Sequence, residues 1–287
     1  MNFSQLIAGT MTWGSWGKNL DQDQMATLIK TCADVGITTF DHADIYGGYT
    51  TEAAFGSAFK KSGISRRSVQ FITKCGILYP GGNRDIAFKH YDYSKEYIIW
   101  SVEKSLENLQ TDYLDLLLLH RPSPLMQTDE IAAAIDKLKT SGKIKQFGVS
   151  NFTPTQTDLI ASKTKIEYNQ IQFSVTQHDA LTNGHLDHMI LNQIRPMAWN
   201  PLGDVFRIEN EQTVRIKELL VRLMAKYDAS PDVLLLAWIL KHPAGILPVF
   251  GTANSERITQ LIKSTEITLD NEDWFALWVE SRGEKVP

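Results

Sequence analysis

Four side chains that can move or stabilise a proton stand at the ends of short apolar segments of this chain. Asp41 and Tyr46 lie in TFDHADIYGGY, Lys74 lies in FITKCG, and His120 lies in LDLLLLHRPSP. An ionisable residue at the point where a buried strand meets a loop is held by the scaffold and still reaches a ligand. The four positions together therefore predict a site.

These residue types suit proton transfer to an oxygen atom. A tyrosine hydroxyl has an ordinary pKa of about 10, and a neighbouring ammonium group lowers that value by stabilising the phenolate. Lys74 is the expected ammonium, and Asp41 is the carboxylate expected to keep it charged and oriented. His120 is expected to hydrogen-bond the oxygen of a carbonyl substrate. That oxygen becomes an alcohol as hydride reaches carbon, and because no side chain donates hydride, a nicotinamide cofactor is required.

Each of these residues also has a structural interpretation. Taken singly, Asp41 would end a strand, Tyr46 would be a turn aromatic, and His120 would be a strand-end histidine. Lys74 is harder to explain in this way, because an unpaired ammonium inside a core carries a large desolvation cost. Their joint occurrence in one order favours the site. Asp115, inside the apolar run, is expected to be a buried structural acceptor.

Short apolar runs alternate along the chain with longer stretches of helical spacing. The predicted strands are Leu6 to Gly9, Thr38 to Ala43, Val69 to Cys75, Tyr113 to His120, Gln146 to Ser150, Tyr168 to Ser174, Arg195 to Asn200 and Ile246 to Gly251. The predicted helices that follow them are Asp23 to Val35, Glu52 to Lys60, Ser94 to Leu109, Asp129 to Thr140, Thr155 to Ala161, His185 to Gln193, Gln212 to Tyr227 and Ser255 to Ser264. This is βα repetition.

Eight such units in 287 residues predict an α/β fold, a (β/α)8 TIM barrel that forms a single domain over residues 1–287. An open doubly wound sheet ranks below it, because the first βα turn, IAGTMTWG, lacks the GxGxxG phosphate fingerprint. Two helices are expected in addition to the eight units, Ser230 to Leu240 and a C-terminal helix from Asp270 to Val279. In a barrel the carboxyl ends of the strands meet on one face, so the four side chains become neighbours.

Composition narrows the possible partners. The net charge is -4, with 22% charged residues of mixed sign and no Lys/Arg run that would indicate a nucleic-acid or membrane surface. No apolar stretch approaches the roughly 20 residues that span a bilayer, and the N-terminal segment lacks the pattern of a signal peptide. The two cysteines, Cys32 and Cys75, imply no disulfide framework. A cytoplasmic protein is expected.

The chain resembles the aldo-keto reductase family. The resemblance extends from AGTMTWG near residue 10 to GTANSERI near residue 254. The family's order of Asp, Tyr, Lys and His is met in FDHADIYG, TKCG and LLLLHRP. GVSNF at residues 148–152 and WNPLG at residues 199–203 add to the likeness. DHADIYGGY and HRPSPLM are most similar to a bacterial branch of NADP(H)-dependent oxidoreductases.

The resemblance implies NADPH-dependent reduction of an aldehyde or ketone. In this reaction the resemblance implies that Tyr46 is the general acid, that Lys74 and Asp41 adjust the pKa of Tyr46, and that His120 orients the carbonyl. The cofactor would be NADP(H), with Trp199 stacked on the nicotinamide and Arg257 on the 2'-phosphate. The other implied cofactor-binding residues are Gly9, Thr10, Met11, Asp41, Ser150, Asn151, Gln170, Asn200, Pro201, Leu202, Gly203, Gly251 and Thr252.

The chain departs from the family pattern at three positions. Gly251 stands where many members have a lysine, Asn200 replaces a frequent serine, and Asp204 would be unfavourable near a pyrophosphate unless it points away. His42 is expected to pack beneath the site or to alter its polarity. Trp13, Trp16 and Trp100 are candidates either for the substrate pocket or for the core, and Trp13, which closely follows the first strand, is the strongest candidate for the pocket. Residues 78–93 are expected to form a variable pocket wall.

Two other function classes stay open. A nicotinamide-binding sensor or regulatory subunit would bind the cofactor with little turnover. A metal-dependent barrel hydrolase would recruit Asp41, His42, Asp44 and His120, although Lys74 would be an awkward cation beside a metal. Two measurements distinguish these classes from a reductase: a hydrolase would contain bound metal, and a reductase would bind the cofactor. The sequence predicts neither the physiological substrate nor the oligomeric state.

Overall fold

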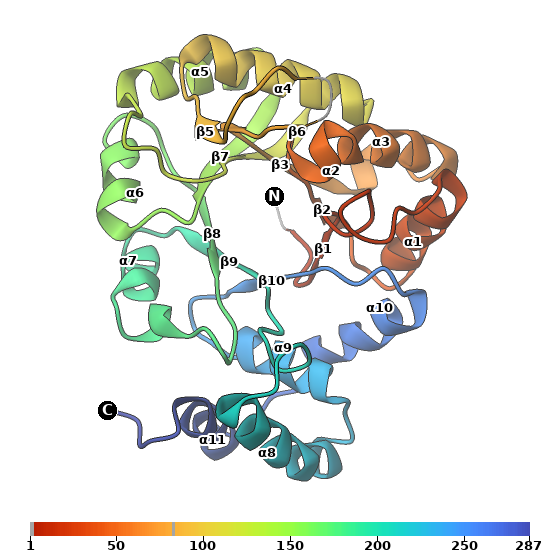
Figure 1. Ribbon diagram of the computed structural model, residues 1–287, viewed down its shortest axis with the longest axis vertical. Helices are drawn as coiled ribbons and strands as arrows, with labels where there is room; N and C mark the ends of the chain where they lie inside the picture. The colour runs from red at the N-terminus through yellow and green to blue at the C-terminus, as the bar shows by residue number, and fades with distance from the viewer. Residues whose placement is uncertain (1–2, 82–83) are drawn as a thin grey trace.

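Eight parallel strands form a closed barrel in the computed structural model, which describes residues 3–81 and 84–287 (Figure 1). The order around the ring is β1, β10, β9, β8, β7, β6, β3, β2 and back to β1. The strands are β1 (Ile7–Gly9), β2 (Thr39–Asp41), β3 (Gln70–Cys75), β6 (Leu114–Leu119), β7 (Ile144–Ser150), β8 (Tyr168–Gln172), β9 (Arg195–Trp199) and β10 (Leu247–Phe250). They correspond one to one with the predicted strands, and the (β/α)8 prediction is confirmed.

The two faces of each strand explain why the strand sequences are apolar throughout. All six residues of β6 are buried: Leu116 and Leu118 contribute to the barrel interior, while Leu117 and Leu119 pack outwards with the helices. The interior cluster consists of Phe3, Ile7, Ile72, Leu116, Leu118, Tyr168, Met197, Leu247 and Val249. A strand covered on both sides is typical of a parallel sheet surrounded by helices.

A ring of helices covers the barrel (Figure 1). These helices are α1 (Gln22–Asp34), α3 (Thr51–Ser62), α4 (Lys95–Leu109), α5 (Thr128–Thr140), α6 (Pro154–Ala161), α7 (His185–Leu191), α9 (Pro231–Leu240) and α10 (Ser255–Leu261). Side-chain caps start several of them: the Ser94 hydroxyl accepts from the amide of Tyr97, and Thr153 forms a capping box with Gln156. None of the helices in the described residues is long and apolar enough to cross a membrane.

Two helices lie between β9 and β10, and the sequence-based prediction exchanged their places in the fold. Gln212 to Tyr227 was expected to cover the barrel, with Ser230 to Leu240 as the extra helix. Instead α9 is buried along nearly its whole length, and its Trp238 stacks on Phe173 at 5.5 Å between ring centroids. Helix α8 (Glu211–Tyr227) lies outside the ring beside the C-terminal helix α11 (Asn271–Arg282) (Figure 1). Because α9 is apolar on every side and α8 on one side only, α9 takes the buried position.

A short antiparallel hairpin, β4 (Ile77–Leu78) and β5 (His90–Tyr91), follows β3 and was not predicted. Ile77 and Tyr91 pack with residues that follow β2, among them Ala43, Ile45 and Tyr46. The hairpin belongs to the segment expected as a pocket wall. Residues 82–83 of that segment lie outside the described residues.

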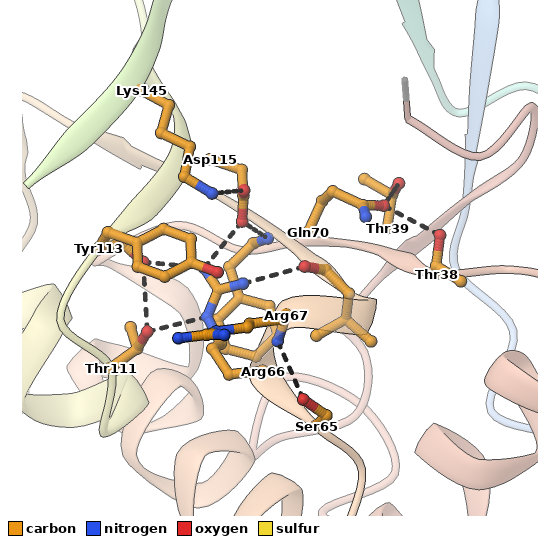
Figure 2. A network of polar contacts seen from close by, with 12 residues as sticks. Thr38, Thr39, Ser65, Arg66, Arg67, Gln70, Thr111, Tyr113, Asp115 and Lys145 are labelled. Atoms are coloured by element: carbon orange, nitrogen blue, oxygen red, sulfur yellow. Dashed lines mark hydrogen bonds and ion pairs between the residues drawn. The ribbon is translucent and has the colours of Figure 1, made fainter. Parts of the chain in front are cut away.

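A polar network holds three strands together at their amino ends (Figure 2). The carboxylate of Asp115, in β6, accepts from Arg66 Nη2 at 2.7 Å, from Lys145 Nζ of β7 at 3.0 Å and from the backbone amide of Phe71 of β3 at 2.9 Å. Arg66 also donates from Nε to the Thr111 hydroxyl at 2.8 Å. Asp115 is therefore the buried structural acceptor that the sequence predicts.

Replacing Asp115 with Asn tests this role. We expect Asp115→Asn to lower the free energy of unfolding by about 3 kcal/mol, because it removes the only negative charge between two cations in the network. Urea denaturation followed by circular dichroism measures the change. The matched control is Asp112→Asn, an exposed residue on the connection just before β6. Equal effects of the two substitutions would contradict the structural role of Asp115.

Candidate functional site

Lys74 lies at the centre of the site. Its Nζ atom donates to Asp41 Oδ2 at 2.6 Å, to the carbonyl oxygen of His42 at 2.9 Å and to the hydroxyl of Tyr46 at 3.2 Å. Lys74 and Asp41 are both buried, whereas Tyr46 is partly exposed. The three side chains come from β3, the end of β2 and the segment after β2, so the barrel brings them together as predicted.

Two glycines let the chain turn directly after Tyr46. Tyr46 begins α2 (Tyr46–Tyr49), in which Gly47 and Gly48 have φ of 62° and 64°. A Cβ atom on Gly47 would lie 2.5 Å from the Thr51 hydroxyl. Since residues with side chains rarely adopt this conformation, the glycine pair fixes the path that presents the tyrosine hydroxyl to Lys74.

The ion pair between Lys74 and Asp41 affects the protonation states of Lys74 and Tyr46. Burial acts to lower the pKa of Lys74, but the negative charge of Asp41 and the contact with Tyr46 outweigh it, so the pKa of Lys74 is raised and the ammonium keeps its charge. Burial raises the pKa of Tyr46, and the charge of Lys74 opposes this rise without cancelling it. The expected lowering of the tyrosine pKa is therefore wrong in its net direction. Tyr46 carries its proton at neutral pH and is an acid.

His120 is the second group that faces Tyr46. It follows β6 directly, and its ring lies edge-on to the Tyr46 ring with 6.1 Å between centroids. Burial, together with the positive charges of Lys74, Arg121 and Lys89, holds the pKa of His120 well below its usual value. The ring is neutral, and its buried Nδ1 has no hydrogen-bond partner in the described part of the chain. A neutral imidazole keeps one N–H to donate to an oxygen.

His42 supports the site from below, as expected. It is fully buried, its Nδ1 lies 2.8 Å from the Thr10 hydroxyl, and its ring packs edge-on against Phe55 at 4.3 Å. Burial, followed by the charges of Lys74 and Arg66, lowers the pKa of His42 well below its usual value. His42 is thus a neutral packing residue beneath the reacting groups.

A series of hydrogen bonds connects Asp41 to residues on the far side of the barrel. Gln170, in β8, donates from Nε2 to Asp41 Oδ1 at 3.0 Å, so both carboxylate oxygens are used. The Ser150 hydroxyl donates to the carbonyl oxygen of Gln170 at 2.9 Å, and Asn151 donates from Nδ2 to that hydroxyl at 2.8 Å. Asn151 also accepts from Trp199 Nε1 at 2.9 Å, which fixes the orientation of the indole ring. These four residues, predicted to contact nicotinamide, lie together at the carboxyl ends of β7, β8 and β9.

The turn after β9 contains the residues predicted near the pyrophosphate, Asn200 to Gly203. Asn200 has φ of 53°, a conformation that asparagine tolerates better than most residues, and Gly203 has φ of 58°. Arg207 donates from Nη2 to Asn200 Oδ1 at 2.7 Å, to the carbonyl oxygen of Gly203 at 3.0 Å and to Asp204 Oδ1 at 3.2 Å. The ion pair with Arg207 explains how an acidic Asp204 is accommodated here.

The loops after β1 and β10 are joined to each other. The Thr12 hydroxyl donates to the carbonyl oxygen of Gly251 at 2.6 Å, and Trp13 Nε1 donates to that of Thr252 at 3.2 Å. Of the residues predicted near nicotinamide in this region, Gly9 and Thr10 are buried and Met11 is exposed. The predicted nicotinamide and adenosine segments are thus directly connected.

Arg257 lies at the start of α10. Its Nε donates to Asp232 Oδ2 at 2.8 Å, and its side chain is 42% exposed. Asp232 lies in the first turn of α9 and is buried, so it orients the arginine while the two terminal nitrogens form no hydrogen bond within the described residues. A guanidinium held in this way can donate to a phosphate group.

This arrangement fits a dinucleotide with phosphate groups. Trp199 offers a partly exposed indole whose hydrogen-bond partner, Asn151, also donates to the carbonyl oxygen of His120. Two arginines lie near the segments predicted to meet phosphates, Arg207 after the turn that follows β9 and Arg257 in the first turn of α10. Aromatic surface for a ring and cations for phosphates are the donor set that NADP(H) requires.

The residues of the metal-hydrolase alternative do not converge. Asp41 is bound to Lys74 and Gln170, and His42 to Thr10, as described above. Asp44 accepts from the Ser101 hydroxyl at 3.0 Å, on the side of α4. Among residues 3–81 and 84–287, no group of three or more His, Cys, Asp or Glu side chains is placed to share a metal ion.

Sequence reasoning missed Tyr79 and two arginines, and it preferred Trp13 to Trp16 as the substrate-facing aromatic residue. Trp13 is fully buried and packs on Phe40 and Phe55, so its expected place facing the substrate is wrong. Trp16 is 41% exposed instead, with its ring 6.2 Å from that of Tyr46 and 5.5 Å from that of Tyr79. The missed arginines are Arg207 and Arg121. The motif HRP places Arg121 beside His120, which was the available signal.

Comparison with known proteins identifies the family of this chain. Residues 5–278 match the model of the Aldo/keto reductase family. The chain is 40% identical to the Uncharacterized oxidoreductase YcsN of Bacillus subtilis, over 100% of this chain and 97% of that protein. It is 39% identical to a 6-dehydroglucose reductase of Agrobacterium fabrum, over 98% and 97% of the two chains.

The fold is shared with an aldo/keto reductase from Klebsiella pneumoniae, whose crystal structure contains NADP and acetate. The TM-score is 0.81 at 24% identity, covering 99% of this chain and 93% of that one, and at this identity the likeness concerns the fold. The family match over nearly the whole chain and the 40% identity show that this chain belongs to the aldo/keto reductase family of oxidoreductases.

Proposed function

We propose that this chain catalyses the NADPH-dependent reduction of an aldehyde or ketone to an alcohol. The observation that carries the proposal is the position of Lys74 Nζ, 2.6 Å from Asp41 Oδ2 and 3.2 Å from the Tyr46 hydroxyl. A protonated tyrosine next to a buried ammonium is suited to give up its proton to an oxygen that becomes negative during the reaction.

Each of the four side chains has one role in this reaction. The carbonyl oxygen accepts hydrogen bonds from the Tyr46 hydroxyl and the neutral imidazole of His120. Tyr46 transfers its proton to that oxygen as negative charge develops there. The positive charge of Lys74 stabilises the resulting tyrosinate, and Asp41 keeps Lys74 protonated and in place.

When bound, NADPH supplies the hydride. Trp199 would stack on the nicotinamide, and Gln170, Ser150 and Asn151 would lie around its carboxamide. Further contacts come from Gly9, Thr10 and Met11 at one end, the turn of Asn200, Pro201, Leu202 and Gly203 in the middle, and Gly251, Thr252 and Arg257 at the other end. NADP in the Klebsiella pneumoniae structure supports this choice of cofactor.

The substrate is a small carbonyl compound. A sugar aldehyde is the first candidate, because a relative 39% identical over nearly its whole length is named a 6-dehydroglucose reductase. Both cysteines, Cys32 and Cys75, are free and buried, which supports the cytoplasm as the compartment.

The first experiment is a titration of the protein with NADPH and NADH by tryptophan fluorescence. Loss of NADPH absorbance is then followed with 6-dehydroglucose, simple aldehydes and diketones. NADPH binding with carbonyl-dependent oxidation supports a reductase. Binding without turnover across the panel would favour the sensor class instead, and absence of binding would refute the proposal.

Tyr46→Phe tests the general acid. We expect the rate of carbonyl reduction to fall about 10³-fold, because the hydroxyl that donates the proton is lost while the ring is retained. The NADPH dissociation constant should not change. Tyr113→Phe is the control, since Tyr113 directly precedes β6 and its hydroxyl is therefore at the amino end of the barrel, opposite to Tyr46. Reduction at the parent rate by Tyr46→Phe would show that another group supplies the proton.

Arg257→Gln tests the phosphate contact. We expect the dissociation constant of NADPH to rise about 30-fold, through loss of charged hydrogen bonds to the 2'-phosphate. NADH lacks that phosphate, so its affinity reports any damage caused by leaving Asp232 without its partner. Fluorescence titration of both cofactors measures the two effects. Equal losses for NADPH and NADH would remove the 2'-phosphate role from Arg257.

A further inference from the structure

Arg121 follows His120 directly and has no role in the mechanism above. Its backbone is held firmly: the buried Tyr93 donates its hydroxyl to the carbonyl oxygen of Arg121 at 2.5 Å and accepts from the Arg121 amide at 3.2 Å. The start of the arginine side chain is therefore fixed at the carboxyl end of β6, next to a catalytic residue.

The guanidinium of Arg121 forms no ion pair with a carboxylate of the described residues. Within residues 3–81 and 84–287, the arginines that form ion pairs are Arg66, Arg207, Arg222, Arg257 and Arg282. Arg121 is half-buried, and its guanidinium contacts the ring of Trp199 at 5.7 Å from the centroid, which is a weak attraction. A half-buried cation whose donors are unused gains most from a ligand that accepts hydrogen bonds.

The position of Arg121 indicates that the ligand accepting these hydrogen bonds is the substrate. Arg121 follows His120 in the chain, its guanidinium lies over the ring of Trp199, and the His120 ring lies 6.1 Å from that of Tyr46, so the guanidinium is at the same end of the barrel as the two groups that would hold the carbonyl oxygen. Trp16 adds exposed aromatic surface beside Tyr46. A substrate bound at Tyr46 and His120 thus meets a free guanidinium as well as an aromatic wall.

We propose that Arg121 determines substrate specificity by binding the non-reacting end of the substrate through two adjacent oxygen atoms. The planar guanidinium donates two parallel hydrogen bonds, which match the oxygens of one carboxylate or of two neighbouring hydroxyl groups. This inference rests on the proposed carbonyl reductase function. It adds to that function a requirement for a paired-oxygen group beyond the carbonyl.

Two pairs of probes separate the two sources of paired oxygens. One pair is 4-formylbenzoate and 4-formylbenzamide, which differ in a carboxylate. The other pair is glyceraldehyde and propanal, which differ in two neighbouring hydroxyl groups. The measured quantity is the ratio of kcat/KM within each pair, so a general change in catalysis cancels. Arg121→Gln and Arg121→Lys are compared with Arg67→Gln, which removes the same charge from an exposed position near the amino end of the barrel.

We expect the ratio within one pair to fall about 30-fold in Arg121→Gln, mainly through KM, since two charged hydrogen bonds are lost. Arg121→Lys should retain part of the preference, because it keeps the charge and loses the planar geometry. Arg67→Gln should leave both ratios unchanged. A fall confined to the benzoate pair identifies a carboxylate, and a fall confined to the glyceraldehyde pair identifies a diol.

Unchanged ratios in Arg121→Gln for both pairs would overturn the inference. So would a loss of NADPH affinity with unchanged ratios, which would assign Arg121 to the cofactor. If the unaltered protein reduces none of the four probes, the wider panel with 6-dehydroglucose and diketones decides whether the reductase function holds. In that case titration with benzoate and benzamide, followed by tryptophan fluorescence, still shows whether Arg121 prefers the carboxylate.

Discussion

The buried ion pair between Lys74 and Asp41 is the constraint on which the site depends. A lysine inside a barrel is tolerated only when a carboxylate compensates its charge and hydrogen bonds satisfy what is left. Asp41 provides the carboxylate from the neighbouring strand, and Gln170 reaches across from β8 to occupy its second oxygen. Because β8 faces β2 only in a closed barrel, the orientation of Lys74, and through it of Tyr46, depends on the whole ring.

Burial of the same site shifts the pKa values of two titratable side chains, Tyr46 and His120, in opposite directions. Burial raises the pKa of Tyr46 and lowers the pKa of His120, so that the tyrosine keeps its proton and the histidine stays without a second one. The positive charge of Lys74 adds to the lowering at His120 and opposes the rise at Tyr46. The two side chains thus present a hydroxyl proton and a neutral imidazole side by side.

Much of the fold could be predicted because the barrel strands are short, mainly apolar runs, and the grouping of Asp41, Lys74 and His120 because each stands at or beside the carboxyl end of such a run. The hairpin β4–β5 could not, since two-residue strands have no periodicity to detect. Helical spacing located α8 and α9 without showing which of them packs on the barrel. The net pKa shift of Tyr46 depends on how completely loops enclose it, and so does the exchange of Trp13 for Trp16 as the exposed aromatic. Both are long-range properties that local sequence does not contain.

The hydrogen bonds between the first and last βα loops have a consequence for folding. Thr12 and Gly251 are 239 positions apart, and contacts of such separation form late, because the entropy of closing a long loop opposes them. The segments 9–11 and 251–257 meet only when β10 has joined β1. A growing chain on the ribosome therefore cannot bring these two segments together until its final strand has emerged. Formation of the contacts between them during refolding would mark the moment of ring closure.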